Sequence, residues 1–433
     1  MNTPAATPGR ALLSLDEALA RLAAGSATQV LTATEQVSTF EALGRVLAAD
    51  VRSALDVPPA DNTSMDGYAM RAADVPAAGT VLPVSQRLPA GVVGAPLAPG
   101  TAARIFTGAQ VPAGADAVVM QEECEAIADE GNASQPLGRV RVRTVPASGQ
   151  WIRRRGEDVH AGATVLVRGT RLTPQALGLA ASVGAGTLQV LRRPRVAVFS
   201  TGDELVMPGE ALKPGAIYNS NRFTLRGLLQ AAGCNVSDFG IVPDRLDATR
   251  DALRRAAAHN DLIVTSGGVS VGEEDHLRPA VLAEGRIENW QIAMKPGKPL
   301  AFGAVRRGSP EGGAAGEGGE ALFVGLPGNP VSSFVTFVLC VSTVLRAMQG
   351  LPTGLPRPLP LRAAFDWPRA DKRREFLRVR LNEAGELELF DNQSSGVLTS
   401  AVWADGLVDN PAGQRIARGD TVRYLPLAEL VAR

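Results

Sequence analysis

The sequence predicts a multidomain α/β plus β chain, with a doubly wound α/β domain between a β-rich N-terminal region and a small all-β C-terminal domain. Its 433 residues exceed what one ordinary core holds. Three runs, Val196–Phe199, Leu262–Val264 and Leu322–Val324, are continuously apolar, as in buried parallel strands. Because ligands of such sheets bind at the carboxyl ends of the strands, the loops that follow should share one crevice.

The N-terminal part is expected to begin with an amphipathic helix and to continue as strands. Ser14 and Glu17 fit a capping box ahead of an apolar helical face. From residue 51 to about residue 171, short apolar runs such as Val118–Met120 are broken by Pro and Gly. This pattern is typical of β structure with long connections.

Helical and apolar segments then alternate, which predicts the α/β domain. Thr173 and Pro174 fit an N-cap and a first-turn proline. Further helices are expected over Asn221–Ala232, over Leu246–His259 and from Pro330 onward. The glycine-rich segment 307–320 is interpreted as a disordered hairpin loop without chemistry. The alternation in 376–381 and the turn before 386–390 predict the C-terminal β domain.

Composition argues against several functional classes. Lys plus Arg and Asp plus Glu both number 44, and aromatic residues make up 4%, which disfavours nucleic-acid binding. Cys124, Cys234 and Cys340 lie too far apart for a zinc motif or a disulfide framework, so buried reduced thiols are expected. No signal peptide is evident, and the apolar stretch Phe334–Leu345 is shorter than the ~20 residues of a membrane span. We therefore expect a cytoplasmic protein without a membrane partner.

The loops after the three apolar runs carry residues suited to binding phosphate. Gly267 to Gly272 resembles a phosphate cradle, because glycines let backbone amides approach an anion. It is not a Walker loop, since Glu273 and Glu274 stand where Lys and Ser or Thr should be, and alone it could equally be a tight turn. The predicted binding residues of the three loops are Ser200, Thr201, Gly202, Ser266, Gly267, Gly268, Ser270, Gly272, Pro327, Gly328, Asn329 and Pro330.

Four acids at the same predicted sheet edge suit a magnesium ion. Asp203, Glu204, Asp244 and Asp275 each follow an apolar run or loop, and Mg²⁺ prefers oxygen ligands beside phosphates. The alternative is that each acid merely caps a helix. Asn329 and Pro330 also fit an N-cap and a first-turn proline, leaving free amides toward the crevice.

Two polar stretches lie outside the α/β domain. Residues 61–68 pack polar groups densely, and residues 153–158 place arginines next to acids. Taken alone, such charge runs are most often solvated faces.

Together these motifs resemble the molybdopterin molybdenumtransferases, the MoeA family, which is related to the E-domain of gephyrin. The matching segments, in chain order, are residues 61–69, 153–158, 200–204, 266–272 with Asp275, 295–299 and 325–330. The similarity runs from about Leu13 to the end of the chain. No single motif would be specific, but the set is.

The resemblance implies a cytoplasmic, homodimeric transferase of molybdenum cofactor biosynthesis. Such enzymes take adenylylated molybdopterin and molybdate, cleave the adenylate with Mg²⁺ and release AMP. The implied domains are 1–50 with 145–190 (extended helical and linker), 51–144 (inserted, β-rich), 191–350 (molybdopterin-binding) and 351–433 (β-barrel). The N-terminal parts of one subunit would face the α/β crevice of the other, and other enzymes of cofactor biosynthesis would be partners.

The resemblance also transfers functional positions to this chain. The matching catalytic residues are Asp66, Asp158, Glu204, Asp244, Asp275 and Lys295, and further binding positions are Thr107, Arg153, Pro327, Pro330, Arg378 and Ser395. Arg153, Lys295 and Arg378 are expected to contact anions, and Asp66 to position or activate a water or oxo group. One position departs, because Gln291 stands where the family pattern has a lysine, and a neutral amide cannot neutralise an oxyanion.

Two other functions are compatible with part of the pattern. The adenylyltransferase of the same pathway resembles the same α/β domain but would not need residues 61–69 or the C-terminal domain. A gephyrin-like scaffold would bind a peptide at the dimer but would not need Asp66, Glu204 and Asp275 beside two glycine loops.

Overall fold

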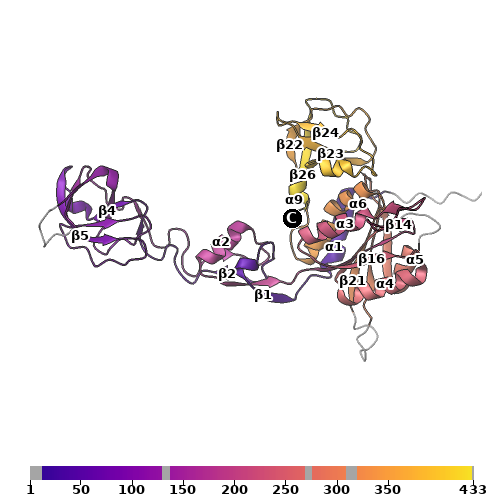
Figure 1. The fold of residues 1–433 in the computed structure, drawn as a ribbon, viewed down its shortest axis with the longest axis horizontal. Helices are drawn as coiled ribbons and strands as arrows, with labels where there is room; N and C mark the ends of the chain where they lie inside the picture. The colour runs from indigo at the N-terminus through magenta and orange to yellow at the C-terminus, as the bar shows by residue number, and fades with distance from the viewer. Residues whose placement is uncertain (1–11, 129–136, 269–275, 309–318, 432–433) are drawn as a thin grey trace, which may run out of the picture. The chain divides into compact units, whose positions relative to one another are not determined.

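The computed structural model describes residues 12–128, 137–268, 276–308 and 319–431. The chain forms two compact units (Figure 1). The inserted unit is Gln36–Val190, and the main unit combines Met1–Glu35 with Leu191–Arg433. The strands β1 (Thr34–Ser38) and β12 (Thr187–Leu191) lie where the chain passes from one unit to the other.

The main unit is built on a six-stranded sheet. Its order is β16 (Asn235–Val242), β13 (Arg195–Thr201), β17 (Leu262–Ser266), β21 (Glu320–Leu326), β20 (Pro299–Arg306) and β18 (Gly285–Gln291). The first four strands are parallel to one another, and β20 and β18 are antiparallel additions. The three apolar runs therefore form adjacent parallel strands, as predicted. Their continuous apolar sequence matches their position, since β13, β17 and β21 are almost entirely buried.

Helices cover both faces of this sheet, which confirms the doubly wound α/β prediction (Figure 1). One face carries α1 (Leu15–Ala27), α3 (Ser220–Ala231), α6 (Pro330–Thr336), the π-helical turn η4 (Phe337–Val341) and α7 (Ser342–Met348). The other carries α4 (Leu246–His259) and α5 (Leu277–Glu284). Side chains of the parallel strands alternate between the two cores, since Val198 packs on the first face and Phe199 on the second.

A second sheet follows in the main unit. Its order is β19 (Met294–Lys295), β23 (Arg374–Leu381), β25 (Gly406–Asn410), β26 (Thr421–Pro426) and β22 (Leu359–Arg362), with β24 (Leu387–Leu389) paired to β23. Two short helices, α8 (Thr399–Trp403) and α9 (Leu427–Val431), accompany it. The predicted C-terminal β structure is present, but β23 lacks a solvated face over most of its length. Phe376 joins the core of the α/β part, whereas Leu377 and Val379 join the core of this sheet.

The inserted unit is mostly β structure, as its Pro- and Gly-broken apolar runs indicated. Its sheet has the order β7 (Ala117–Met120), β4 (Gly67–Met70), β6 (Ala102–Ile105), β5 (Thr80–Leu88), β9 (Arg139–Val142) and β8 (Cys124–Ile127). Short pairs join β3 (Asn62–Thr63) to β10 (Ile152–Arg153) and β2 (Val51–Arg52) to β11 (Thr164–Leu166). The helix α2 (Pro174–Ser182) and the 3₁₀ turns η1 (Thr39–Glu41), η2 (Ala72–Asp74) and η3 (Gln121–Glu123) complete it.

Helix ends follow the local chemistry of the sequence. Ser14 and Glu17 form the predicted capping box of α1. Thr173 caps α2 by accepting a hydrogen bond from the Ala176 amide, with Pro174 in the first turn. The glycine-rich segment joins β20 to β21, and its middle, 309–318, lies outside the described residues.

The apolar stretch Phe334–Leu345 lies within a longer helical run, Pro330–Met348. The length and composition of this run would allow it to cross a membrane. However, 83% of its most apolar 18-residue window is buried inside the protein, as in the core helix of many soluble proteins. The three cysteines are free thiols, and Cys234 and Cys340 are buried as predicted, whereas Cys124 is only half-buried. Partial burial still raises the pKa of the Cys124 thiol to about 12.

Candidate functional site

A cavity of about 650 Å³ lies at the carboxyl ends of β13, β17 and β21. Residues of all three predicted loops line it. They are Thr201 and Glu204, Ser266 to Gly268, and Pro327 to Pro330, together with residues of the segment 217–221. The structure thus brings the three loops together, whereas Ser270, Gly272 and Asp275 lie outside the described residues.

Two glycines let the loop backbones approach closely. Gly267 has φ +92°, and a Cβ built there would lie 2.9 Å from the carbonyl oxygen of Thr201. Gly268 has φ +64°, and a Cβ there would lie 3.0 Å from the Leu277 Cβ. Because L residues rarely adopt such φ values and no space exists for a side chain, glycine is required at both positions.

The segment 219–221 contributes polar groups that the sequence analysis did not identify. Asn219 is 2% exposed, and its Oδ1 caps α3 by accepting the Arg222 amide hydrogen. Its Nδ2 has no hydrogen-bond partner among the residues that the structure describes. Asn221 Nδ2 donates to the Gly328 carbonyl over 2.8 Å and so joins α3 to the third loop. The available signal was the N-cap pattern of Asn219 just before an expected helix.

Serines occupy the buried floor between the first two strands. The hydroxyl oxygens of Ser200 and Ser266 lie 3.2 Å apart, and the Ser200 hydroxyl also lies 3.4 Å from Asn219 Oδ1. Both serines are almost fully buried. Ser266 nevertheless lines the cavity, whereas Ser200 supports the loops from below without lining it.

Of the four predicted magnesium ligands, two are in contact and one lines the cavity. The Asp244 amide donates to Asp203 Oδ1 over 3.3 Å, and Glu204 lines the cavity. In the part of the chain that the structure describes, no three His, Cys, Asp or Glu side chains gather where they could hold a metal ion. Since Mg²⁺ is commonly bound by one or two carboxylates plus phosphate and water, Glu204 and Asp203 remain suitable donors.

Asn329 differs from its expected role. It occupies the N-cap position with Pro330 in the first turn, but its side chain makes no capping bond. Instead, Asn329 Nδ2 donates to the Ser395 hydroxyl over 3.1 Å, and the Val331 amide donates to the Ser395 carbonyl over 3.0 Å. This helix start is thus partly occupied by Ser395, a predicted site residue, and the Val331 amide is not free as expected.

Arg378 is a buried cation close to Ser395 in the sequence and the fold. It is 1% exposed, and its guanidinium donates to Ser400 Oγ and to the carbonyls of Phe376 and Ser394. No carboxylate among the described residues pairs with it. Burial lowers the pKa of the guanidinium to about 10, because the charged form loses hydration.

Lys295 is already compensated by two acids. Its Nζ lies 3.2 Å from Glu375 Oε1 and 3.4 Å from Asp371 Oδ2. Hydrogen bonds from Arg373, together with the charge of Lys295, hold the pKa of the Asp371 carboxyl well below its usual range. An anion at Lys295 would therefore have to compete with these carboxylates.

Gln291 ends β18, and its carbonyl accepts the Leu13 amide hydrogen.

The inserted unit joins two other predicted residues, Asp66 and Thr107. Asp66 Oδ1 accepts hydrogen bonds from the Thr107 amide over 2.7 Å and from the Thr107 hydroxyl over 2.8 Å. The Thr107 amide, the Thr107 hydroxyl and the charge of Arg104 hold the pKa of Asp66 below its usual value. Asp66 is therefore an oriented carboxylate.

The polar stretches 61–68 and 153–158 lie side by side. Arg153 pairs in register with Asn62, and Asp61 accepts hydrogen bonds from the Arg154 guanidinium and the Arg155 amide. Arg153 and Asp158 are exposed, and no ion pair within the described ranges involves either of them. These two predicted residues are thus available for contacts, but the structure does not bring them to Asp66.

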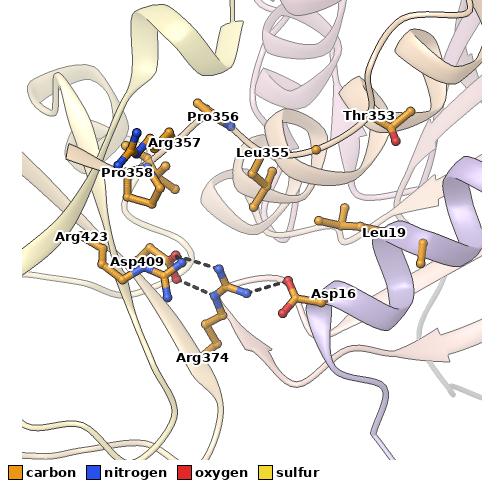
Figure 2. Close-up of a pocket in the computed structure, with 13 residues that line it drawn as sticks. Asp16, Leu19, Thr353, Leu355, Pro356, Arg357, Pro358, Arg374, Asp409 and Arg423 are labelled. Atoms are coloured by element: carbon orange, nitrogen blue, oxygen red, sulfur yellow. Dashed lines mark hydrogen bonds and ion pairs between the residues drawn. The ribbon is translucent and has the colours of Figure 1, made fainter. Parts of the chain in front are cut away.

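Another cavity of the main unit, about 430 Å³, lies between α1 and the C-terminal sheet (Figure 2). Arg374 crosses it from β23. Its guanidinium contacts the buried Asp409 through two nitrogens and reaches Asp16 at the start of α1 over 3.0 Å. None of the predicted site residues lines this cavity.

Comparison with known proteins identifies the family. The chain is 35% identical over 429 residues to a Haemophilus influenzae protein named molybdopterin molybdenumtransferase, covering 97% of this chain and 100% of that relative. The chain belongs to the MoeA family. Residues 13–184 match the MoeA N-terminal region (domain I and II), residues 197–347 a "Probable molybdopterin binding domain", and residues 360–427 the MoeA C-terminal region (domain IV).

Other members agree with this assignment to the MoeA family. A Mycobacterium tuberculosis protein named molybdopterin molybdenumtransferase 2 is 39% identical over 389 residues, covering 87% of this chain and 90% of the relative. The crystal structure of a molybdopterin biosynthesis MoeA protein from Pyrococcus horikoshii OT3 matches with a TM-score of 0.77 at 29% identity, covering 96% of this chain and 99% of that one.

Proposed function

We propose that this chain is a molybdopterin molybdenumtransferase, which inserts molybdate into adenylylated molybdopterin and releases AMP. The observation that carries the proposal is the cavity at the carboxyl ends of β13, β17 and β21, lined by the glycine pair 267–268 and by the loop 327–330. It has a size suited to a small organic ligand. The domain content and the named relatives of the MoeA family support the same activity.

Within this proposal, the chain's own groups bind and orient the substrate. Backbone amides of the glycine loops hold the pterin phosphate, because no side chain at Gly267 or Gly268 keeps an anion away. Asn221 fixes the loop at Gly328 from below. Arg378 adds a buried positive charge that no carboxylate among the described residues compensates, whereas Lys295 would have to exchange its contacts with Glu375 and Asp371 for an anion of the substrate.

Glu204, with Asp203 and Asp244, would hold Mg²⁺ in this proposal. When bound, the ion supplies polarisation of the adenylate phosphoryl group. Glu204 is the best placed of the three, since it lines the cavity with an exposed side chain. Removal of its charge should therefore affect magnesium dependence first.

The proposal further includes a cytoplasmic homodimer. Asp66 and Arg153 to Asp158 of one subunit would face the α/β crevice of the other, and Asp66 would position or activate a water or oxo group. Other enzymes of cofactor biosynthesis would deliver adenylylated molybdopterin and receive the product.

The test is AMP release from adenylylated molybdopterin with Mg²⁺, with and without molybdate. The wild-type protein should release AMP in a molybdate-dependent manner. Glu204→Gln should lower the rate at least about 10-fold, as expected for a lost metal carboxylate. Glu210→Gln is the matched control, because Glu210 is exposed on the same segment but does not line the cavity. Absence of molybdate-dependent release by the wild type would overturn the proposal.

A further inference from the structure

Arg104 forms a strut across the sheet of the inserted unit. Its Nη1 donates to the Gly67 carbonyl over 2.8 Å, and its Nη2 donates to Gln121 Oε1 over 2.6 Å. The guanidinium carbon lies 4.5 Å from the centroid of the Phe106 ring and 5.1 Å from that of the Tyr68 ring. Nη1 also donates to the Ile105 carbonyl over a longer distance of 3.5 Å. Three hydrogen bonds and two cation–π contacts thus fix one side chain.

The partners of the two shorter hydrogen bonds, Gly67 and Gln121, adjoin Asp66. Gly67 is the next residue in the chain, and the Gln121 amide donates to the Asp66 carbonyl over 3.0 Å. Arg104 therefore joins β6 to the two backbone positions that determine where Asp66 sits. Thr107, three residues after Arg104, holds the Asp66 carboxylate itself.

The charges around Asp66 are few. The Thr107 donors and the positive charge of Arg104 are what lower the pKa of Asp66, and no other charged side chain contributes among the described residues. Arg104 has no carboxylate partner of its own in the described ranges. Among the described residues, the hydrogen bonds to the Asp66 carboxylate both go to Oδ1, which leaves Oδ2 for another acceptor role.

Arg87 provides an internal comparison. It lies directly opposite Arg104 in the β5–β6 pairing, and its guanidinium carbon is 4.6 Å from the same Phe106 ring. Unlike Arg104, it makes no hydrogen bond or ion pair through its guanidinium to any residue that the structure describes. Both arginines are positively charged, lie opposite each other in the strand pairing and contact the Phe106 ring. Only Arg104 also hydrogen-bonds to Gly67 and Gln121, the residues next to Asp66.

We propose that Arg104 is a positioning residue for the reaction, which orients the Asp66 carboxylate through Gly67 and Gln121. This inference rests on the proposed function, in which Asp66 acts on the substrate. Arg104 contributes through Asp66 alone. Its loss should therefore have no further effect once Asp66 has lost its charge.

A double-mutant cycle on AMP release tests this dependence. Arg104→Met should lower kcat about 10- to 100-fold with KM nearly unchanged, as expected when a catalytic group is displaced. Asp66→Asn combined with Arg104→Met should equal Asp66→Asn alone. Arg87→Met should retain wild-type kcat. Gln121→Ala, which removes one anchor only, should give a smaller loss than Arg104→Met. The proposal would be overturned if Arg104→Met lowered kcat by the same factor in the Asp66→Asn background as in the wild type. It would also be overturned if Arg87→Met lowered kcat as much as Arg104→Met.

Hydrogen exchange gives a readout that needs no activity. The Thr107 and Gln121 amides, which donate to Asp66, should exchange about 10-fold faster in Arg104→Met but not in Arg87→Met, because only the first loses the strut. Equal exchange in both variants would contradict the positioning role. If the wild type releases no AMP, the proposed function fails, while the exchange comparison still decides whether Arg104 positions Asp66.

Discussion

Gly267 shows at the residue scale how backbone geometry shapes the cavity. Its φ of +92° resembles the +97° of Gly209, but only Gly267 has a neighbouring atom, the Thr201 carbonyl oxygen, where a Cβ would stand. Gly209→Ala should cost about 1 kcal/mol of stability through backbone strain alone. Gly267→Ala should cost at least about 1 kcal/mol more and raise the KM for adenylylated molybdopterin. Equal losses in urea unfolding would show that the contact is unimportant.

The lowered pKa of Asp371 predicts that its contribution to the free energy of unfolding depends on pH. Its folded pKa lies below the unfolded value of about 3.9, so its contribution to stability is present above about pH 5 and is lost as pH falls through the folded pKa. Asp371→Asn should lower the free energy of unfolding by about 1 kcal/mol at pH 7 and by less at pH 3.5. Asp391→Asn, an exposed residue without an ion pair in the described ranges, is the control. A difference that stays constant with pH would contradict this account.

Residue types were easier to predict than their partners. The sequence indicated Asn329 as an N-cap, but its side chain binds Ser395, which is 66 positions further along. Lys295 was expected to meet an anion, and its partner Glu375 is 80 positions away. Local patterns carry no information on such pairings, because the tertiary fold creates them. The magnesium ligands and the other site residues were assigned from local patterns and from the family resemblance, and these assignments remain predictions.

At the scale of elements, Arg374 connects α1 to the C-terminal sheet (Figure 2). Its partner Asp409 is 1% exposed, so Arg374→Met should cost about 3 kcal/mol, because a buried carboxylate loses one of its two cations. Arg380→Met on the same strand breaks the exposed pair with Glu388 and should cost at most about 1 kcal/mol. Thermal unfolding of both variants compares them. Similar losses would indicate that the Arg374 contacts add little.

Elements with a strong local pattern were predicted well. The continuous apolar runs became β13, β17 and β21, and the capping signals of Ser14 and Thr173 mark true helix starts. The π-helical turn at 337–341 has no such signal, because every residue there is buried and apolar. The burial of β23 on both sides depends on two separate cores, which a single strand pattern cannot reveal.

For the whole molecule, the proposed homodimer makes a distinct prediction. Light scattering should give twice the chain mass of 45.1 kDa. Asp66→Ala and Glu204→Gln should each impair the activity strongly. Mixing the two chains should restore up to about one quarter of wild-type activity, because random exchange gives heterodimers with one intact shared site. Each variant mixed with itself is the control. A monomer, or a mixture no better than its components, would contradict a shared site.

The division of the chain depends on contacts far apart in sequence. The structure separates residues 36–190 from the rest. The family resemblance implied finer boundaries at residues 50, 144, 190 and 350, which remain predictions. Composition changes gradually along the chain, and only the long-range pairing of segments before residue 35 and after residue 191 defines the main unit.

The place of α1 in the main unit has a consequence for synthesis. Leu15 and Leu22 of this helix are buried in the core that α7 completes, and the Leu31 amide binds the Met348 carbonyl. The ribosome makes α7 roughly 300 residues after α1, which at about 5–20 residues per second means a wait of roughly 15–60 s. During this time, the apolar face of α1 lacks α7, the last helix of the layer that covers it. Of the elements that form this core, α1 is therefore the one that waits longest for α7 during synthesis.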